Sequence, residues 1–176
     1  YLDPKGPMGQ GTNKDIAEGF MKALEMHNVI IEDKEEFIDY STNLFDSTAL
    51  SSRMYPIVDN MRDLFIELKK KDFLLGIVTS DTDVSTANCL KELEIFEYID
   101  FIGSDDGILP PKPNPGMMEA FCKEFSVQPE EVAVVGDTPT DMNFGMESRA
   151  GVIIGVLSGT SGKDVLDGKA DIIIDS

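Results

Sequence analysis

From residue 55 onward, short apolar runs alternate with amphipathic segments of helical length, and this alternation limits the possible folds more than any other feature. The apolar runs are rich in Val, Ile and Leu along their whole length, which is typical of strands buried on both faces. Predicted helices of ten to fifteen residues separate the runs, and such crossovers connect parallel strands. The sequence therefore predicts an α/β fold, a doubly wound parallel sheet covered by helices on both faces.

The predicted elements of this core follow one another without a long interruption. Four helices are expected, over Ile57–Lys71, Val84–Leu93, Pro115–Phe125 and Asp141–Arg149. Five strands are expected, over Phe73–Val78, Tyr98–Ile102, Val132–Val135, Val152–Val156 and Ala170–Ile174. Ligands of such sheets bind at the carboxyl ends of the strands, so the residues directly after each strand are the candidates for a site.

The first part of the chain has a different, all-helical pattern. Ile16, Phe20 and Leu24 recur at helical spacing, and a second amphipathic helix is expected over Lys34–Phe45. Asn13 is the expected cap of the first helix. A boundary near residue 53 separates this part from the core. The sequence opens on Tyr1 rather than methionine, so we expect a chain that was cut, processed or only partly observed at that end.

The charge balance is strongly acidic. Asp and Glu number 33 against 15 Lys and Arg, a net charge of -18. Such a field repels nucleic-acid backbones and acidic membranes, so neither is an expected partner; a solvated acidic surface that keeps the protein soluble is the simplest reading. No apolar run reaches the roughly 18 residues of a membrane span, and the start of the sequence lacks the pattern of a signal peptide.

Two cysteines and one histidine narrow the chemistry further. Cys89 and Cys122 show no CxxC spacing, and each falls on the apolar stripe of a predicted helix. We expect two reduced core thiols in a cytoplasmic protein. His27 is the single histidine, which rules out a histidine-based zinc cluster and argues against a Ser-His-Asp hydrolase.

Hydroxyl and acidic side chains follow the first predicted strand. Thr79 and Ser80 stand where a strand meets a helix, a position whose hydroxyl and free backbone amides suit a phosphate oxygen. A hydroxyl residue there also serves as a helix cap. Asp81 and Asp83 have the spacing of paired carboxylates, but capping of the next helix by Thr82 or Asp83 explains them as well.

A lysine on a stiff loop follows the second strand. Pro111 and Pro113 restrict the backbone of Lys112, and Pro115 is expected at the first position of the next helix. A lysine held in this way loses little entropy when its ammonium binds an anion. The alternative is an ordinary exposed loop lysine.

Two carboxylates follow the strand that ends at Val135. Gly136 permits a tight turn, and Asp137 and Asp141 then lie four residues apart at the mouth of a helix, where both can approach one hard cation. Mg²⁺ prefers oxygen ligands and is commonly held by one or two carboxylates and a substrate phosphate. Helix capping by Asp141 explains one carboxylate but not both.

Together these motifs resemble those of the haloacid dehalogenase-like hydrolase superfamily, particularly its phosphoglycolate phosphatase-like branch. The resemblance covers about residues 55–176. Its motifs are Gly76–Ser80 (GIVTS), Pro111–Pro113 (PKP) and Val134–Asp141 (VVGDTPTD), with Tyr55-Pro56 and Ser148–Gly151 in support. It implies a Rossmann-like core over residues 54–176, and it implies that residues 1–53 form part of the helical cap that such enzymes insert after their first strand.

The resemblance also implies a Mg²⁺-dependent phosphatase that hydrolyses a small phosphorylated metabolite through an aspartyl-phosphate. Thr79 and Ser80 would bind the phosphoryl oxygens. Lys112 would neutralise charge on the nucleophile and the phosphoryl group, so Thr79 and Lys112 are the candidate catalytic residues. Asp137 and Asp141 would bind or orient the Mg²⁺.

The nucleophile of this superfamily belongs to a strand that ends Asp-x-Asp-Gly-Thr, and no such strand is found. In Asp3–Pro7 no strand precedes the acid, Lys5 replaces the second acid and Pro7 replaces the threonine. Asp81–Ser85 follows a strand that already supplies Thr79. We therefore expect the nucleophile upstream of Tyr1, and the alternative is a second chain that fills the gap in the sheet. The chain by itself is expected to be inactive.

Other functions remain open at this point. One is a catalytically inactive phosphatase-like domain that binds a phosphorylated ligand or a protein partner. A receiver domain also places acids, a hydroxyl residue and a lysine around an aspartyl-phosphate, but without the Gly-Asp-x-x-x-Asp turn. Phosphomutase chemistry is the third alternative.

Overall fold

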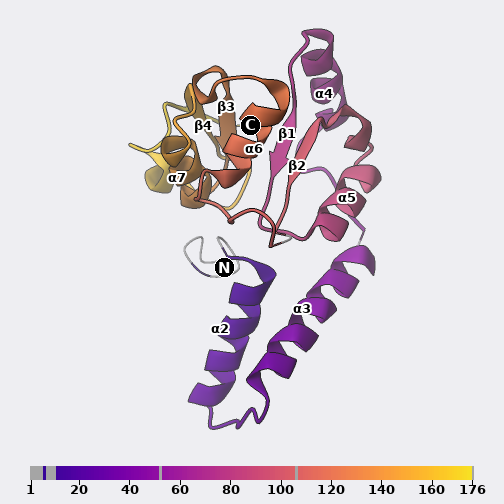
Figure 1. Ribbon diagram of the computed structural model, residues 1–176, viewed down its shortest axis with the longest axis vertical. Coiled ribbons are helices and arrows are strands. Elements are labelled where there is room, and N and C mark those ends of the chain that lie inside the picture. Colours follow the sequence, from indigo (N-terminus) through magenta and orange to yellow (C-terminus); the bar gives the residue numbers. More distant parts are fainter. Residues whose placement is uncertain (1–5, 7–10, 52, 106, 176) are drawn as a thin grey trace.

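A computed structural model describes residues 6, 11–51, 53–105 and 107–175 of the chain. Figure 1 shows a helical hairpin that projects away from an α/β body. The hairpin consists of α2 (Asn13–Met26) and α3 (Lys34–Ser51). Ala17 and Met21 of α2 are buried, and the rings of Phe20 and Phe45 lie 6.2 Å apart between the two helices. The predicted division near residue 53 stays a prediction.

The α/β body alternates helices and strands, as the sequence predicted. Its helices are α4 (Met61–Lys70), α5 (Asp83–Glu92), α6 (Gly116–Phe125), α7 (Pro139–Glu147) and α8 (Lys163–Leu166). Its strands are β1 (Gly76–Val78), β2 (Phe101–Gly103), β3 (Ala133–Gly136), β4 (Val152–Val156) and β5 (Ile172–Ile174). Two short 3-10 helices, η1 (Phe96–Tyr98) and η2 (Pro129–Glu131), precede β2 and β3.

Every strand pair is parallel, but the strands form two sheets rather than one. β1 pairs with β2 in one sheet, and β3, β4 and β5 form the other in that order. The α/β class and the parallel pairing are confirmed. Some strand side chains are nevertheless exposed among the described residues: Val135 of β3 is 59% exposed, and Ile172 and Ile174 of β5 are exposed as well.

One helix, α6, packs against both sheets. Met117, Met118, Phe121 and Cys122 of α6 are buried in a single cluster with Val134 of β3. Val78 of β1 and Phe101 of β2 pack against the same cluster. The apolar residues of α6 recur at helical spacing, and this stripe covers strands of both sheets. A second cluster, Met142, Ile153 and Leu166, lies between α7, β4 and α8.

Several element ends differ from the sequence prediction for identifiable reasons. Thr12, rather than Asn13, caps α2, because its side chain accepts a hydrogen bond from the Asp15 backbone amide in a capping box. α3 continues to Ser51 rather than ending at Phe45. The next helix begins at Met61 rather than Ile57, since Asn60 adopts a left-handed conformation (φ 60°) that a helix does not continue through.

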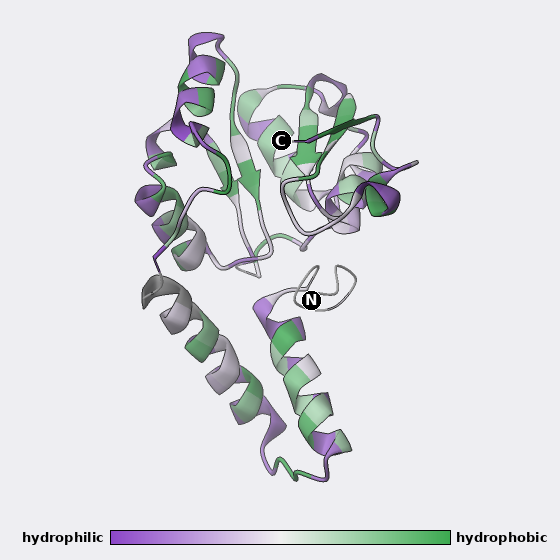
Figure 2. Cartoon of the chain, turned by 180° about the vertical axis from the view of Figure 1, so that it is seen from behind, coloured by the Kyte–Doolittle hydropathy of each residue, from purple (hydrophilic) through white to green (hydrophobic). Residues whose placement is uncertain are grey.

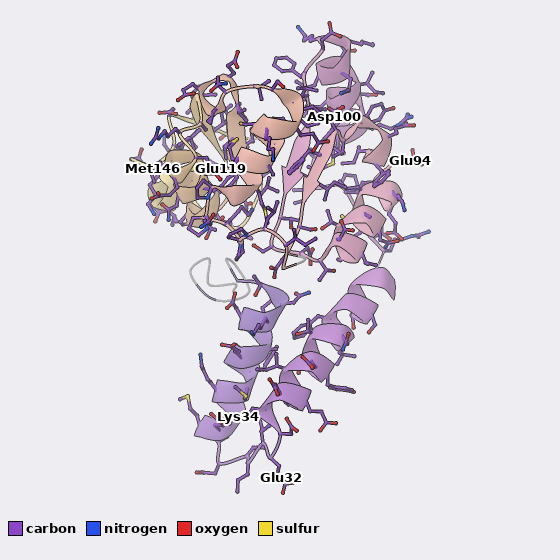
Figure 3. All side chains as sticks on the ribbon, in the orientation of Figure 1. Glu32, Lys34, Glu94, Asp100, Glu119 and Met146 are labelled. Atoms are coloured by element: carbon purple, nitrogen blue, oxygen red, sulfur yellow. The ribbon has the colours of Figure 1, made fainter. Side chains whose placement is uncertain are left out.

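An aspartate fixes the beginning of a strand pair in each sheet. Asp100, just before β2, accepts a hydrogen bond from the Leu75 amide at 2.7 Å, and Asp171, just before β5, accepts one from the Ile153 amide at 2.8 Å. Lys69 of α4 donates to both carboxylate oxygens of Asp100 at 2.8 and 2.7 Å. Figure 3 places Asp100 at the end of the β1–β2 sheet that lies away from the helical hairpin.

Figure 2 shows apolar residues on the strands and mixed polarity along the helices. Within the described part of the chain, no helix combines the length and apolar character that crossing a membrane requires. Both cysteines are free thiols: Cys122 is buried, whereas Cys89 is only half-buried. Burial, followed by nearby acidic side chains, raises the pKa of each thiol.

Candidate active site at the carboxyl ends of the strands

Hydrogen bonds connect the four loops that follow β1, β2, β3 and β4. The Asp105 amide, after β2, donates to the Asp81 carbonyl, after β1, at 2.8 Å. Lys112, later in the same loop, reaches Asp141 in the first turn of α7, which follows β3. Asp137, also after β3, binds Thr160 in the loop after β4. The carboxyl ends of these strands therefore meet in one region, as expected for a parallel α/β fold.

Lys112 and Asp141 form the most buried ion pair of the described residues. The Lys112 Nζ lies 2.7 Å from Asp141 Oδ1, and the two side chains are 13% and 12% exposed. Burial acts to raise the pKa of Asp141, but the Lys112 charge and hydrogen bonds from Lys112 and Thr138 outweigh it, so this pKa lies below its ordinary value. Lys112 is thus a largely buried, paired lysine and not an exposed loop residue.

The second oxygen of Asp141 is also engaged. Thr138 caps α7, and its backbone N–H and hydroxyl donate to Asp141 Oδ2 at 3.0 and 2.6 Å. In return, the Asp141 amide donates to the Thr138 hydroxyl at 3.2 Å, which completes a capping box. Gly136 permits this close approach, because a Cβ at that position would meet Asp141 side-chain atoms at 2.3–2.7 Å.

Asp137 is oriented by the loop that follows β4. Its Oδ2 accepts hydrogen bonds from the Thr160 backbone amide at 2.7 Å and from the Thr160 hydroxyl at 2.9 Å. Gly159 leaves room for the carboxylate, since a Cβ there would lie 2.1 Å from the same oxygen. The structure gives Oδ1 of Asp137 no hydrogen-bond donor among the described residues.

Thr79 and Ser80 lie where β1 ends, on the other sheet. The Thr79 amide continues the strand pairing by donating to the Gly103 carbonyl at 2.9 Å, and the Thr79 hydroxyl accepts from the Asp81 amide at 3.1 Å. Thr82 caps α5 by accepting from the Ser85 amide. That capping leaves Thr79 available for another role, although no hydrogen bond joins Thr79 directly to Lys112 or Asp137 within the described residues.

The donor set fits a magnesium ion that keeps several waters. Asp137 offers one oxygen, while Lys112 and Thr138 engage both oxygens of Asp141. In the part of the chain that the structure describes, no three His, Cys, Asp or Glu residues converge as a metal-binding group. Mg²⁺ is commonly bound through one or two carboxylates plus a substrate phosphate, and Asp137 could supply one such carboxylate.

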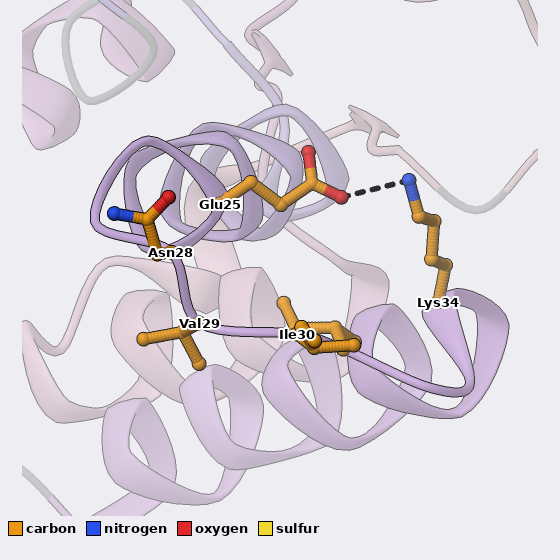
Figure 4. A pocket seen from close by; sticks show the side chains of 6 residues that line it. Glu25, Asn28, Val29, Ile30 and Lys34 are labelled. Atoms are coloured by element: carbon orange, nitrogen blue, oxygen red, sulfur yellow. Dashed lines mark ion pairs between the residues drawn. The ribbon is translucent and has the colours of Figure 1, made fainter.

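Two pockets formed by the described residues lie on the helical hairpin. One is lined by Glu25, Asn28, Val29, Ile30, Ile31 and Lys34, and Figure 4 shows the 2.7 Å ion pair between Lys34 and Glu25 at its margin. A second lies between α2 and α3. Neither contains a residue of the strand-end motifs, so neither defines the candidate site.

Sequence reasoning missed two residues of the site, Thr138 and Thr160. Thr138 had a local signal, since a threonine three positions before an aspartate at a helix start is typical of a capping box. Thr160 contacts Asp137 across 23 positions of sequence, which no local pattern reveals. Its only signal is its place directly after the strand Val152–Val156.

These features define a class: a parallel α/β protein that gathers a buried lysine, hydroxyl residues and carboxylates at the carboxyl ends of its strands. The model of one family, haloacid dehalogenase-like hydrolase, matches residues 9–154. The chain belongs to this family. The resemblance inferred from the three motifs is therefore confirmed.

Relatives of known name agree with the family. A phosphoglycolate phosphatase of Nitrosococcus oceani is 25% identical over 164 residues, which cover 90% of this chain and 72% of the relative. A phosphoglycolate phosphatase of Nitrosospira multiformis is 27% identical over 127 residues, or 72% of this chain and 55% of the relative. The chain thus matches only part of each relative's length.

Solved structures confirm the fold. A predicted phosphoglycolate phosphatase from Haemophilus somnus 129pt superposes with a TM-score of 0.75 at 18% identity, covering 93% of this chain and 71% of that structure. β-Phosphoglucomutase from Clostridium difficile superposes with a TM-score of 0.71 at 20% identity, covering 94% of this chain and 71% of that structure. At these identities the likeness concerns the fold alone.

Proposed function

We propose that the intact protein is a Mg²⁺-dependent phosphatase that hydrolyses a small phosphomonoester through an aspartyl-phosphate. The observation that carries this proposal is the largely buried Lys112–Asp141 pair in the region where the four strand-end loops meet, with Asp137 four residues before Asp141 in the chain. A fixed ammonium and, in the same region, a carboxylate with a free oxygen suit a phosphoryl group and a hard cation. The relatives named phosphoglycolate phosphatase favour the same chemistry.

Each residue of the site has a role in this proposal. The Thr79 hydroxyl and the Ser80 amide bind phosphoryl oxygens, and Lys112 lowers the repulsion between the phosphoryl group and an attacking carboxylate. Asp137 would hold the Mg²⁺, which would offset the charge of the phosphate when bound. Because Lys112 and Thr138 occupy both oxygens of Asp141, Asp141 holds Lys112 in place rather than binding the metal itself.

The nucleophile is proposed to lie on a strand outside the described residues, between β1 and β3. Its carboxylate forms a bond to phosphorus as the bond from phosphorus to the leaving alkoxide breaks, and a second carboxyl group two residues later gives that alkoxide its proton. Water then cleaves the aspartyl-phosphate, which releases inorganic phosphate and restores the carboxylate. The same strand would supply the second carboxylate of the metal site.

The test measures hydrolysis of p-nitrophenyl phosphate by the intact protein with Mg²⁺ and with EDTA. We expect activity only with Mg²⁺, and a loss of at least about 100-fold in kcat/KM for Asp137→Asn, as electrostatic groups of active sites commonly contribute. Asp164→Asn, an exposed aspartate on α8, is the matched control and should be unaffected. Hydrolysis that survives EDTA and Asp137→Asn would refute the proposal, and phosphate binding without hydrolysis would favour the inactive binding domain.

A further inference from the structure

We propose that Thr160 is a positioning residue for Asp137: the loop after β4 fixes one carboxylate oxygen and so directs the other toward the metal. This inference rests on the proposed function, because it assigns Asp137 as the Mg²⁺ ligand. The inference assigns a role in the site to Thr160 and to the loop after β4. Neither belongs to the three sequence motifs or to the capping box of α7.

The contact has the geometry of an orienting partner. Two donors of one residue, the backbone amide and the hydroxyl of Thr160, converge on the same oxygen, Asp137 Oδ2, at 2.7 and 2.9 Å. Two donors on one oxygen fix the rotation of the carboxylate plane more firmly than one donor does. The other oxygen, which no described residue contacts by a hydrogen bond, then has a defined direction.

The loop is held at both ends, so it can act as a fixed support. At its start the Leu157 amide donates to the Ile174 carbonyl of β5 at 3.0 Å. Directly after Thr160, Ser161 is buried, and Leu166 of the following helix is fully buried in the cluster with Met142 and Ile153. Asp137 itself precedes the cap of α7, whose first turn is fixed by the Thr138–Asp141 capping box. The position of the Asp137 carboxylate is therefore fixed by its own backbone next to α7 and by the loop that carries Thr160.

Gly159 has a steric role in the same arrangement. A Cβ at position 159 would lie 2.1 Å from Asp137 Oδ2 and 2.3 Å from its Cβ and Cγ. Contacts this short are not tolerated, so any side chain at position 159 forces the carboxylate or the loop to move. A glycine is required here by the close approach of Asp137.

Partners that orient a metal ligand commonly contribute 10- to 100-fold to metal affinity. The test measures Mg²⁺ binding to the intact protein by isothermal titration calorimetry, which does not depend on turnover. Thr160→Val removes the hydroxyl but keeps the backbone amide, so we expect the Kd for Mg²⁺ to rise by about tenfold, the lower end of that range. Thr160→Ser keeps both donors and should bind Mg²⁺ as the wild type does. Gly159→Ala should raise the Kd further, because it displaces the carboxylate.

Melting temperatures without Mg²⁺ separate orientation from folding. We expect Thr160→Val to melt close to the wild type without metal and to gain less stability from added Mg²⁺. A wild-type Kd in Thr160→Val, or an equal loss in Thr160→Ser, would overturn the inference. If Asp137→Asn abolishes Mg²⁺ binding while Thr160→Val does not affect it, only the role of Thr160 is wrong. If Asp137→Asn binds Mg²⁺ normally, the assigned metal ligand is wrong, and with it the proposed function.

Discussion

The Lys112–Asp141 pair shows how one residue can serve both stability and chemistry. Both side chains are largely buried, and the carboxylate also receives two hydrogen bonds from Thr138. A buried charge that loses its partner is costly, whereas removing both charges is often tolerated. Comparing single and double substitutions therefore distinguishes the contribution of the pair to stability from its contribution to activity.

Lys112→Met should lower the free energy of unfolding of the intact protein by about 3 kcal/mol, because it leaves the Asp141 carboxylate buried without a cation. The value lies at the lower end of the range for buried pairs, since Thr138 still donates to that carboxylate. Lys112→Met combined with Asp141→Asn should recover most of the loss, yet remain inactive. Urea unfolding measures the stabilities, and Lys123→Met, at an exposed lysine of α6, is the control. Equal losses in the single and double variants would show that the ion pair is not the cause.

The strands are short, and in each sheet an aspartate side chain binds a backbone amide where a strand pair begins. Asp100 joins α4 to the β1–β2 pair, through Lys69 on one side and the Leu75 amide on the other. Burial acts to raise the pKa of Asp100, but the hydrogen bonds from Lys69 and Leu75 and the Lys69 charge outweigh it, so the pKa lies below its ordinary value. A carboxyl group with a lowered pKa in the folded state contributes stability above its unfolded pKa, and that contribution is lost as the pH falls through the folded value.

Asp100→Asn should therefore destabilise the protein by roughly 1 kcal/mol near pH 7, a modest value because Asp100 and Lys69 are partly exposed. The difference from the wild type should shrink as the pH falls from about 4, the ordinary pKa of an aspartate, through the lower folded pKa. Urea unfolding at a series of pH values measures it, with the exposed Asp167→Asn as control. A difference that stays constant down to pH 2 would exclude the ionised carboxylate as the source of the stability.

The elements also show which features a sequence pattern can predict. Strand existence follows from continuous Val and Ile runs, which is why β3 and β4 were found almost to the residue. The first strand was predicted three residues too long because Phe73 and Leu74 are apolar, yet both are exposed before β1 begins. Lys112, Asp137 and Asp141 could be proposed as site residues from the sequence because each follows a predicted strand, and their roles stay predictions. Thr160 was missed since its contact with Asp137 spans 23 positions and exists only in the folded chain.

The strands of the molecule are divided into two separate sheets, whereas α6 packs against both of them. α6 packs on strands of both sheets in one continuous cluster, but among the described residues β1 pairs only with β2, and β3 pairs only with β4. Two parallel sheets that share a covering helix and remain unpaired at their facing edges leave backbone donors and acceptors without strand partners. The exposed Val135 on β3 lies beside this discontinuity. A further strand between β1 and β3 would pair both edges and bring the proposed nucleophile next to Thr79, Lys112 and Asp137.

Hydrogen–deuterium exchange tests this arrangement directly. Amides of residues 76–79 and 133–136 should exchange much faster in the 176-residue chain than in a longer protein that carries the proposed upstream strand, because only the longer protein pairs both edges of each strand. Peptides from β4, which is already paired on both sides by β3 and β5, serve as the internal control and should differ less. If protection of β1 and β3 is the same in both proteins, no strand of the longer protein lies between them, and the nucleophile would have to reach Lys112 from a loop. If protection rises at β1 and β3 together, one strand joins the two sheets, and the catalytic carboxylate is carried by the same element that completes the fold.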